Sequence, residues 1–299
     1  MPKITVGDIS LNYFQVGHGP DLVMIHGLGA NMAFWYPKVV RLLAGDFRVT
    51  IYELRGHGAS DMPASGYTSR DMAEDLTGIM DSLGIERAHL VGHSFGGSVA
   101  LHTAVLHSER VATLTLADAV VKALQERKTL RDWPYWMDVL KAKYASLGIK
   151  LDDGVEFDAD MLQKLSDPRL AGAREDSRNS GFFLPFGSWN GGRKAAAMWQ
   201  RLMSETTARQ DFKDVAGLTR ENIAGISIPA LAVYGEHSMF LDVLHELSGL
   251  IRCLKTVMVP GRGHFHPAVE PEFFAKALKE FIKNNSDGKY LAYADGANG

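Results

Sequence analysis

Residues 89–99 read HLVGHSFGGSV, and they lead from a short apolar strand into a run of small residues that we expect to be helical over about 97–107. A serine enclosed by Gly92 and Gly96 is typical of a sharp turn between a strand and a helix, because glycine has no Cβ and lets both elements close on the serine. Such a serine is strained, at a cost of about 1–3 kcal/mol that proteins usually keep for function. The turn would present the Ser94 hydroxyl above the positive end of the helix, so Ser94 is a candidate nucleophile.

A second glycine-rich loop follows an earlier strand. Residues 21–25 form a buried strand run that ends in HGLGA at 26–30. A serine that attacks a carbonyl group creates an oxyanion, which needs two preorganised N–H donors, and removing one such donor typically costs about 10²–10³ in rate. In a turn of this kind one donor is the amide of the residue after the serine, here Phe95, and the other comes from the loop after an earlier strand. The open turn makes the Leu28 amide the second candidate.

A histidine follows the last strand of the chain. Residues 254–259 are strand-like, and the loop PGRGHF at 260–265 comes next. An imidazole with the ordinary pKa of about 6.5 ionises close enough to neutrality to take the serine proton and return it to a leaving group. His264 follows a Gly-x-Gly turn, late in a chain that already has the serine turn and the oxyanion loop. This position indicates that His264 is the base.

Together these motifs resemble the α/β-hydrolase fold family, in particular its members that carry a cap. The resemblance covers roughly residues 3–120 and 221–285, and it rests on the loop at 26–30, RGHGAS at 55–60, the serine turn and GRGH at 261–264. Each motif alone is a weak indication, but their order and distances are specific. The resemblance implies a nucleophile, a histidine and an acid at the carboxyl ends of the strands. It also implies that the Arg-Gly-x-Gly turn is mainly structural.

The acid departs from the commonest pattern of that family. Many relatives carry it three residues after the glycine that ends the seventh strand, which is Gly235 here, and that position is Ser238. Serine has no charge with which to stabilise an imidazolium, so another carboxylate must do so. Asp118 ends the sixth strand, where some branches of the family place the acid, and we expect it to serve here. Glu236 and Asp242 remain alternatives, and an Asp at that strand end also occurs in purely structural roles.

The order of the elements predicts the fold class. Short buried strands alternate with helical patterns, which is typical of an α/β protein whose mostly parallel central sheet carries helices on both faces. The strand runs are 3–7, 10–16, 21–26, 47–54, 87–93 and 111–118, and the helical patterns are 33–44, 69–84 and 95–107. The first two runs predict an antiparallel hairpin at the sheet edge. Ligands of such sheets bind beyond the carboxyl ends of the strands, where all the candidate residues fall.

A different pattern separates the sixth strand from the seventh. Residues 122–220 show helical stretches with many aromatic residues and no strand alternation, so we expect a helical cap on a core formed by 1–121 and 221–285. The aromatic residues either form a small core of the cap or line an apolar pocket above Ser94. The candidates for the pocket are Trp133, Trp136, Phe182 and Phe186. The polar, glycine-containing tail at 286–299 is expected to be loose.

Composition limits the class of protein. The 299-residue chain carries 32 Lys and Arg against 35 Asp and Glu, and this net charge of −3 offers no electrostatic footprint for nucleic acid or anionic lipid. Since it has no apolar run near 18 residues and no signal-peptide pattern at its start, we expect a cytoplasmic protein without a membrane partner. The loop at 27–32 lacks the third small residue of a dinucleotide fingerprint, and the run HFH at 264–266 is a poor chelate. We therefore expect no cofactor and no metal.

The resulting interpretation is a serine hydrolase that cleaves an ester or thioester of a small, largely apolar substrate through an acyl-enzyme. Ser94 attacks, His264 moves the proton and Asp118 orients the histidine. The amides of Leu28 and Phe95 hold the oxyanion. Epoxide hydrolases and haloalkane dehalogenases would need a carboxylate in place of the serine.

Two alternatives stay open. One is a carbon–carbon bond hydrolase of the same fold, although such enzymes tend to carry a proline-containing oxyanion loop that this chain lacks. The other is a small-molecule receptor that uses the fold with little turnover.

Overall fold

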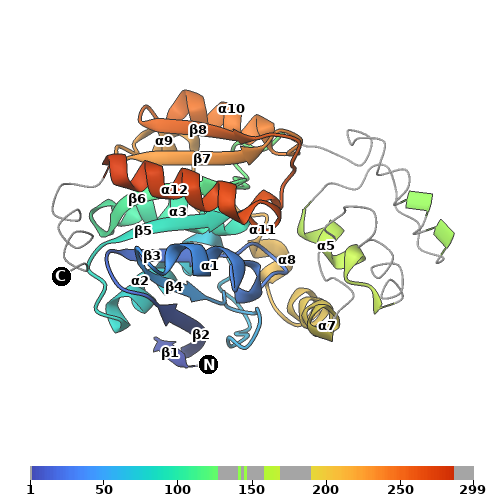
Figure 1. Cartoon of the computed structure of the whole chain (residues 1–299). Helices are drawn as coiled ribbons and strands as arrows, with labels where there is room; N and C mark the ends of the chain where they lie inside the picture. Colours follow the sequence, from blue (N-terminus) through green and yellow to red (C-terminus); the bar gives the residue numbers. More distant parts are fainter. Residues whose placement is uncertain (1, 127–140, 143–144, 147–157, 169–189, 286–299) are drawn as a thin grey trace.

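The computed structural model describes residues 2–126, 141–142, 145–146, 158–168 and 190–285. An eight-stranded sheet with the order β1-β2-β4-β3-β5-β6-β7-β8 forms its centre (Figure 1). The strands are β1 (Lys3–Val6), β2 (Ile9–Val16), β3 (Asp21–Ile25), β4 (Arg48–Tyr52), β5 (Ala88–His93), β6 (Val111–Ala117), β7 (Ala230–Gly235) and β8 (Leu254–Val259).

The sheet is mixed but mostly parallel. β1 pairs with β2, and β2 with β4, in antiparallel fashion, whereas β4, β3, β5, β6, β7 and β8 run parallel. The predicted hairpin at the sheet edge is therefore confirmed, and so is the fold class. In the parallel register Ile25 stands opposite Gly92, which stands opposite Leu116. The carboxyl ends of β3, β5 and β6 consequently meet at one edge of the sheet.

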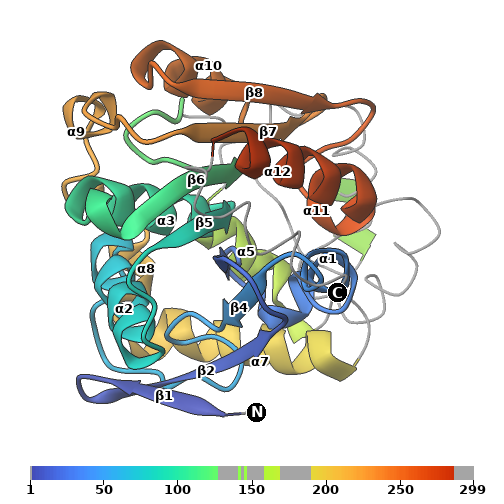
Figure 2. The same ribbon diagram turned by 60° about the vertical axis from the view of Figure 1, so that its left-hand side comes forward.

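Helices cover both faces of the sheet (Figures 1 and 2). On one face α1 (Lys38–Leu43) and α12 (Pro271–Asn285) contact each other and pack on a cluster that includes Leu22, Val91 and Val233. On the other face lie α2 (Ser69–Ser82), α3 (Phe95–Leu106) and α10 (Leu241–Leu250), which share the larger core cluster. Both apolar faces of the central strands are thus buried, which is why these strands read as continuous apolar runs.

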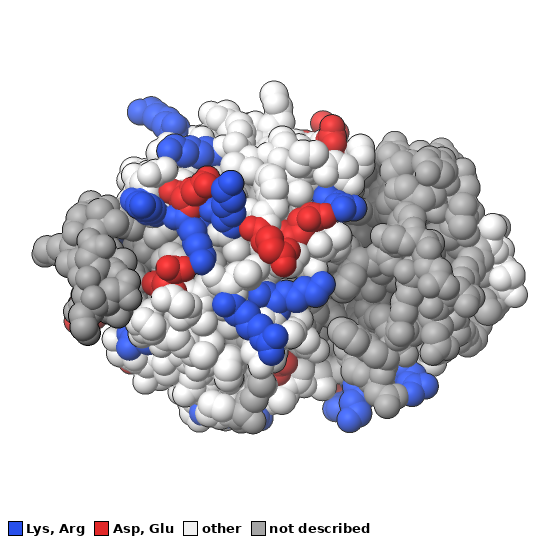
Figure 3. All heavy atoms as spheres, viewed as in Figure 1, with Lys and Arg blue, Asp and Glu red and all other residues white. Residues whose placement is uncertain are grey.

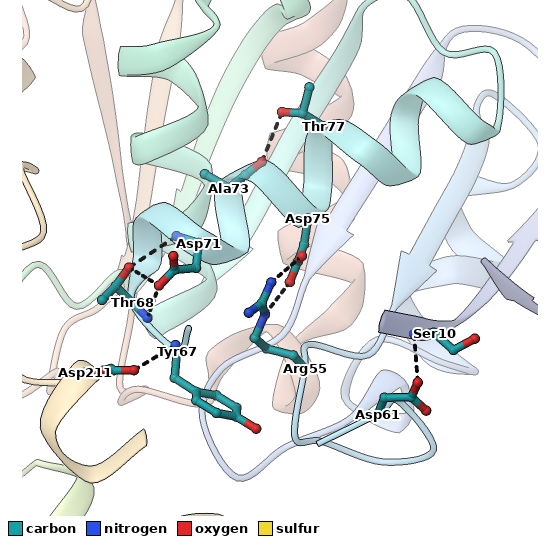
Figure 4. Close-up of polar contacts among 10 residues, drawn as sticks. All are labelled: Ser10, Arg55, Asp61, Tyr67, Thr68, Asp71, Ala73, Asp75, Thr77 and Asp211. Carbon is teal, nitrogen blue, oxygen red and sulfur yellow. Dashed lines mark hydrogen bonds and ion pairs between the residues drawn. The ribbon is translucent and has the colours of Figure 1, made fainter. Parts of the chain in front are cut away.

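The helix expected over 33–44 is divided. A 3₁₀ turn η1 (Met32–Phe34) comes first, and α1 begins only after Pro37. Proline disfavours helical backbone in the residue before it, which explains why the helix does not run continuously through Tyr36. By contrast α2 begins close to its predicted start, because Thr68 and Asp71 form a capping box with each other's backbone N–H groups (Figure 4).

The segment between β6 and β7 contains helices and no strand among its described residues. The elements after α3 other than those above are η2 (Ser108–Arg110), α5 (Ala159–Leu165), α7 (Asn190–Glu205), α8 (Ala208–Asp211), α9 (Arg220–Ala224) and α11 (His266–Val269). Four predicted pocket residues, Trp133, Trp136, Phe182 and Phe186, lie outside the described residues, as does the tail at 286–299. The division into core and cap stays a prediction.

The described surface shows no concentration of one charge on the side in Figure 3. Basic and acidic side chains alternate over α1 and α12, and several are paired, as in the contact between Lys279 and Asp46 at 2.5 Å. No helix within the described ranges is both long and apolar enough to cross a lipid bilayer.

Buried histidines are a recurrent feature of the core. Burial lowers the pKa of His26, His89, His102 and His266 to about 4 and that of His57 to about 3, and it lowers the pKa of His93 well below its ordinary value. Desolvation disfavours the imidazolium form, so these rings stay neutral at pH 7. An unfolded chain would protonate them near their ordinary pKa of 6.5.

This difference predicts that the protein loses stability in mild acid. Between pH 6.5 and about 4 the unfolded state binds more protons than the folded state, so the free energy of unfolding falls as the pH falls through that window. A single fully buried ring such as His26 contributes a loss of about 1–2 kcal/mol between pH 7.5 and pH 5. Urea unfolding at the two pH values measures the effect. His102→Leu should show a smaller loss than the native chain, and equal stability of the native chain at both values would contradict the prediction.

Candidate active site

The turn between β5 and α3 has the strained geometry that its sequence predicts. Ser94 has φ +55° and ψ −123°, a conformation that L-residues rarely adopt. A Cβ on Gly96 would lie 2.5 Å from the Ile25 carbonyl oxygen and 2.6 Å from that of His26, and a Cβ on Gly92 would overlap the Gly96 carbonyl group. Glycine is therefore required on both sides of the serine, since β3, β5 and α3 meet there in backbone contact.

Hydrogen bonds of its own backbone hold the serine in place. Ser94 N–H donates to the Ala117 carbonyl at 3.2 Å, and its carbonyl accepts the Gly97 and Val120 N–H groups at 2.9 and 3.0 Å. The side chain of Ser94 is partly exposed, whereas residues 88–93 and 95–104 are buried. The turn thus presents one hydroxyl group to the outside from an otherwise closed part of the core.

Two backbone N–H groups beside Ser94 have no acceptor among the described residues. Neither Leu28 N–H nor Phe95 N–H donates a hydrogen bond within the described part of the chain. The loop that carries Leu28 lies against the serine, because a Cβ on Gly27 would be 2.8 Å from Ser94 Cβ. Phe95 is the first residue of α3, where N–H groups have no partner within the helix. The two N–H groups that the sequence predicts as oxyanion donors therefore belong to segments beside Ser94 and have no acceptor in the described part of the chain.

Asp118 and His264 form a buried pair. His264 Nδ1 lies 2.8 Å from Asp118 Oδ1, and the side chains are 8% and 0% exposed. Asp118 follows β6 directly and has φ +50°, so a second strained residue stands at this edge of the sheet. Because a carboxylate only accepts hydrogen bonds, His264 Nδ1 carries a hydrogen in this contact, and in the neutral ring Nε2 is then an acceptor.

Several groups keep Asp118 charged. Burial alone would raise its pKa, but the hydrogen bond and charge of His264 oppose this and hold the pKa of Asp118 below its ordinary value. The Ser238 hydroxyl donates to Oδ1 at 2.5 Å, and Gly235 N–H donates to Oδ2 at 3.0 Å. The negative charge therefore has three donors although it is shielded from solvent.

The other candidate acids have different partners. Glu236 accepts a hydrogen bond from Gly261 N–H at 2.8 Å, and Asp242 accepts one from Glu126 N–H at 2.9 Å. Neither carboxylate forms a hydrogen bond with His264. Among the three carboxylates left open by the sequence, Asp118 is the one that the fold brings to the histidine.

Sequence reasoning missed the contributions of Ser238 and His93. Ser238 stands at the position where many relatives carry the acid, and here it donates to Asp118 instead. Its location in the motif was the signal that could have indicated this contact. His93 Nε2 lies 2.9 Å from the His264 carbonyl oxygen, and the two imidazole rings are 4.7 Å apart. No sequence pattern pointed to that link between the serine turn and the histidine loop.

An aromatic cluster adjoins the oxyanion loop. The rings of Trp199 on α7 and Phe212 after α8 are stacked at 5.7 Å, and Phe212 packs edge-on against Phe95 at 5.3 Å. The ring of Phe240 lies 4.9 Å from that of His264. The neighbourhood of the candidate residues is thus largely apolar. Ser94 Oγ forms no hydrogen bond with His264 in this arrangement, and such contacts often tighten only when substrate is bound.

Comparisons with known proteins agree with the fold and identify the family. The model of the alpha/beta hydrolase fold family matches residues 20–271. A curated relative, the 2-(acetamidomethylene)succinate hydrolase of Mesorhizobium japonicum, is 29% identical over 282 residues, which are 94% of each chain. The 2-hydroxymuconate semialdehyde hydrolase of Pseudomonas sp. strain CF600 is 40% identical over 117 residues, 38% of this chain and 41% of that protein. The structure of the enol-lactonase from Burkholderia xenovorans LB400 has a TM-score of 0.67 at 24% identity, covering 94% of this chain and all of that one.

The close backbone contacts predict that Gly96→Ala destabilises the protein. The added methyl group would force the turn away from the end of β3, and overpacking of this kind typically costs about 1–3 kcal/mol. Gly249→Ala is a matched control, because a Cβ at that helical position meets nothing within 4 Å and alanine favours helix. Urea unfolding of both variants measures the difference. Equal stabilities would show that the turn tolerates a side chain at residue 96.

Proposed function

Because this chain belongs to the alpha/beta hydrolase fold family, we propose that it is a serine hydrolase that cleaves an ester or thioester through an acyl-enzyme. The observation that carries the proposal is the buried hydrogen bond between Asp118 and His264 at the same sheet edge as the strained Ser94. A buried carboxylate that holds an imidazole by Nδ1 prepares Nε2 to accept a proton.

In the proposed reaction Ser94 Oγ attacks the carbonyl carbon of the substrate while His264 Nε2 accepts the hydroxyl proton. The imidazolium that forms is stabilised by the charge of Asp118. Negative charge develops on the carbonyl oxygen, and the N–H groups of Leu28 and Phe95 are the donors for it. The histidine then gives its proton to the departing alcohol or thiol. A water molecule, deprotonated by the same histidine, hydrolyses the acyl-enzyme and regenerates Ser94.

The surroundings of the site favour a small and largely apolar acyl group. Phe95 and Phe240 border the candidate residues, and Trp199 and Phe212 extend the apolar surface from the side of Phe95. Apolar walls with a few convergent polar groups are typical of small-molecule sites.

A carbon–carbon bond hydrolase is the second candidate. The partial match to a 2-hydroxymuconate semialdehyde hydrolase favours it, and a serine nucleophile is compatible with both reactions. The oxyanion loop at 26–30 has no proline, which favours an ester or thioester hydrolase over a carbon–carbon bond hydrolase. A panel containing p-nitrophenyl esters, acyl thioesters and a ring-cleavage product separates the two activities by their relative kcat/KM.

The nucleophile is tested by Ser94→Ala. This change should abolish labelling by a fluorophosphonate probe and most of the turnover of p-nitrophenyl butyrate, leaving about 10³–10⁴ over the uncatalysed rate from binding and the oxyanion donors. Mass spectrometry of the labelled peptide and initial rates provide the two measurements. Wild-type turnover by the variant would exclude Ser94 as the nucleophile. Labelling of the native chain without turnover of any panel member would favour a receptor.

The acid is tested by moving the carboxylate. Asp118→Asn should lower kcat by up to about 10⁴, since an amide cannot stabilise the imidazolium and favours the wrong tautomer. Ser238 Oγ lies 2.5 Å from Asp118 Oδ1, so Ser238→Asp placed in the Asp118→Asn background should restore at least about tenfold of the lost rate.

Glu236→Gln and Asp242→Asn serve as controls for this test, because their carboxylates bond to other backbone groups. Each should stay within a few-fold of the native kcat. A loss at either control comparable with that of Asp118→Asn, together with no rescue by Ser238→Asp, would relocate the acid.

A further inference from the structure

His57 is a buried histidine that the proposed reaction does not use. It lies in the Arg-Gly-x-Gly turn after β4 and is 3% exposed. Its Nε2 is 3.1 Å from Gly29 N, and its Nδ1 is 3.0 Å from the Arg55 carbonyl oxygen. Gly29 directly follows Leu28, whose N–H is one of the proposed oxyanion donors. His57 therefore connects two loops at the carboxyl ends of β3 and β4.

These two contacts determine the state of the imidazole. Nε2 receives the Gly29 N–H and must be an acceptor, whereas Nδ1 faces a carbonyl oxygen and must carry the hydrogen. Only the neutral Nδ1–H tautomer satisfies both. Burial and the neighbouring His26 lower the pKa of His57 to about 3, so this form persists through the neutral range.

The carbonyl group that selects the tautomer is itself anchored. The Arg55 guanidinium forms two hydrogen bonds with Asp75 of α2, at 2.6 and 2.7 Å, and the ion pair is largely buried (Figure 4). A bidentate pair of this kind fixes both position and orientation. A continuous set of contacts thus runs from α2 through Arg55 and His57 to the oxyanion loop.

The contact with His57 also contributes to which N–H groups of the oxyanion loop have an acceptor. Gly29 N–H is bound to His57, and Ala30 N–H donates to the Gly27 carbonyl at 3.3 Å. Leu28 N–H, between the two bonded segments of the loop, keeps no acceptor among the described residues. On the other side the His57 ring packs against Trp199 of α7 at 5.9 Å, next to the stack with Phe212 that reaches Phe95.

We propose that His57 is a positioning residue of the oxyanion hole: its neutral ring binds Gly29 N–H and thereby holds Leu28 N–H toward the carbonyl oxygen of the substrate. This inference rests on the proposed hydrolase function. In this role His57 accepts one hydrogen bond and transfers no proton. A group that holds a donor in place acts on the transition state, where the oxyanion exists, more than on substrate binding.

Three variants separate the acceptor from the bulk of the ring. His57→Leu removes both polar atoms, and His57→Asn keeps a donor near the place of Nδ1 but no acceptor near Nε2. His57→Gln places an amide oxygen near Nε2. For p-nitrophenyl butyrate we expect kcat to fall about 10- to 100-fold for the Leu and Asn variants and less than about fivefold for Gln, with KM within about threefold in all.

The second measurement is the rate of the oxygen ester divided by the rate of its thionoester. A purely structural role of His57 would leave this ratio unchanged. Sulfur is a weaker hydrogen-bond acceptor than oxygen, so a well-positioned oxyanion donor favours the oxygen ester. The ratio should fall in His57→Leu and His57→Asn and stay close to the native value in His57→Gln. His102→Leu is the matched control, because His102 is equally buried but pairs with Ser69 between α2 and α3. Its kcat and its ratio should equal those of the native chain.

The outcomes distinguish this inference from the function on which it depends. Native turnover by Ser94→Ala would overturn the proposed function. If Ser94→Ala is inactive while all three His57 variants keep the native kcat and ratio, the positioning role alone is wrong. Equal losses in the Asn and Gln variants, or a loss of kcat with an unchanged ratio, would overturn it as well. Should His57→Leu fail to fold, the comparison of Asn with Gln decides the question.

Discussion

Three backbone segments meet at the end of β5 with no space for a side chain between them. The ends of β3 and β5 and the first turn of α3 approach one another at Gly92 and Gly96, and Ser94 adopts a left-handed backbone conformation between them. This steric constraint decides where the hydroxyl group can be. It also brings the loop after β3 against the serine. A candidate nucleophile and two N–H groups that have no acceptor among the described residues therefore share one small region.

A buried charge is the second organising element, and its environment explains how the acid can stand after β6. The carboxylate of Asp118 is fully buried, and a charge in that situation is tolerated only with several donors. Gly235 at the end of β7, Ser238 in the loop after β7 and His264 in the loop after β8 supply them. The strand end that many relatives use for the acid contributes a hydroxyl donor here. The carboxylate therefore stands at the end of β6, and groups at the end of β7 donate hydrogen bonds to it.

Neutral imidazoles form a third pattern around the same edge of the sheet. His26 Nε2 accepts Leu54 N–H and its Nδ1 faces the Gly27 carbonyl, while His93 donates through Nε2 to the His264 carbonyl. Each ring joins loops that come from different strands, and each does so uncharged because burial disfavours the imidazolium. A histidine in this role offers a donor and an acceptor on one rigid ring. The loops of the site are consequently held by neutral rings, and because the unfolded chain would protonate these histidines, mild acid favours unfolding.

The sequence by itself determined the elements whose causes are local. The glycine spacing around Ser94 requires a tight turn, the apolar runs require a parallel sheet covered on both faces, and the two short runs at the start of the chain require a hairpin. Pro37 is also a local signal, because it separates the 3₁₀ turn from the shorter helix where the apolar pattern predicts one helix over 33–44.

Only the tertiary structure decided which carboxylate reaches His264 and what binds the buried histidines. Asp118, Glu236 and Asp242 have similar chemistry, and their distances from His264 depend on how β6, β7 and β8 are aligned rather than on their spacing along the chain. His57 and Gly29 lie 28 residues apart and meet because β3 and β4 are neighbours in the sheet. Contacts of this kind follow from strand order and register, and a local sequence pattern contains neither.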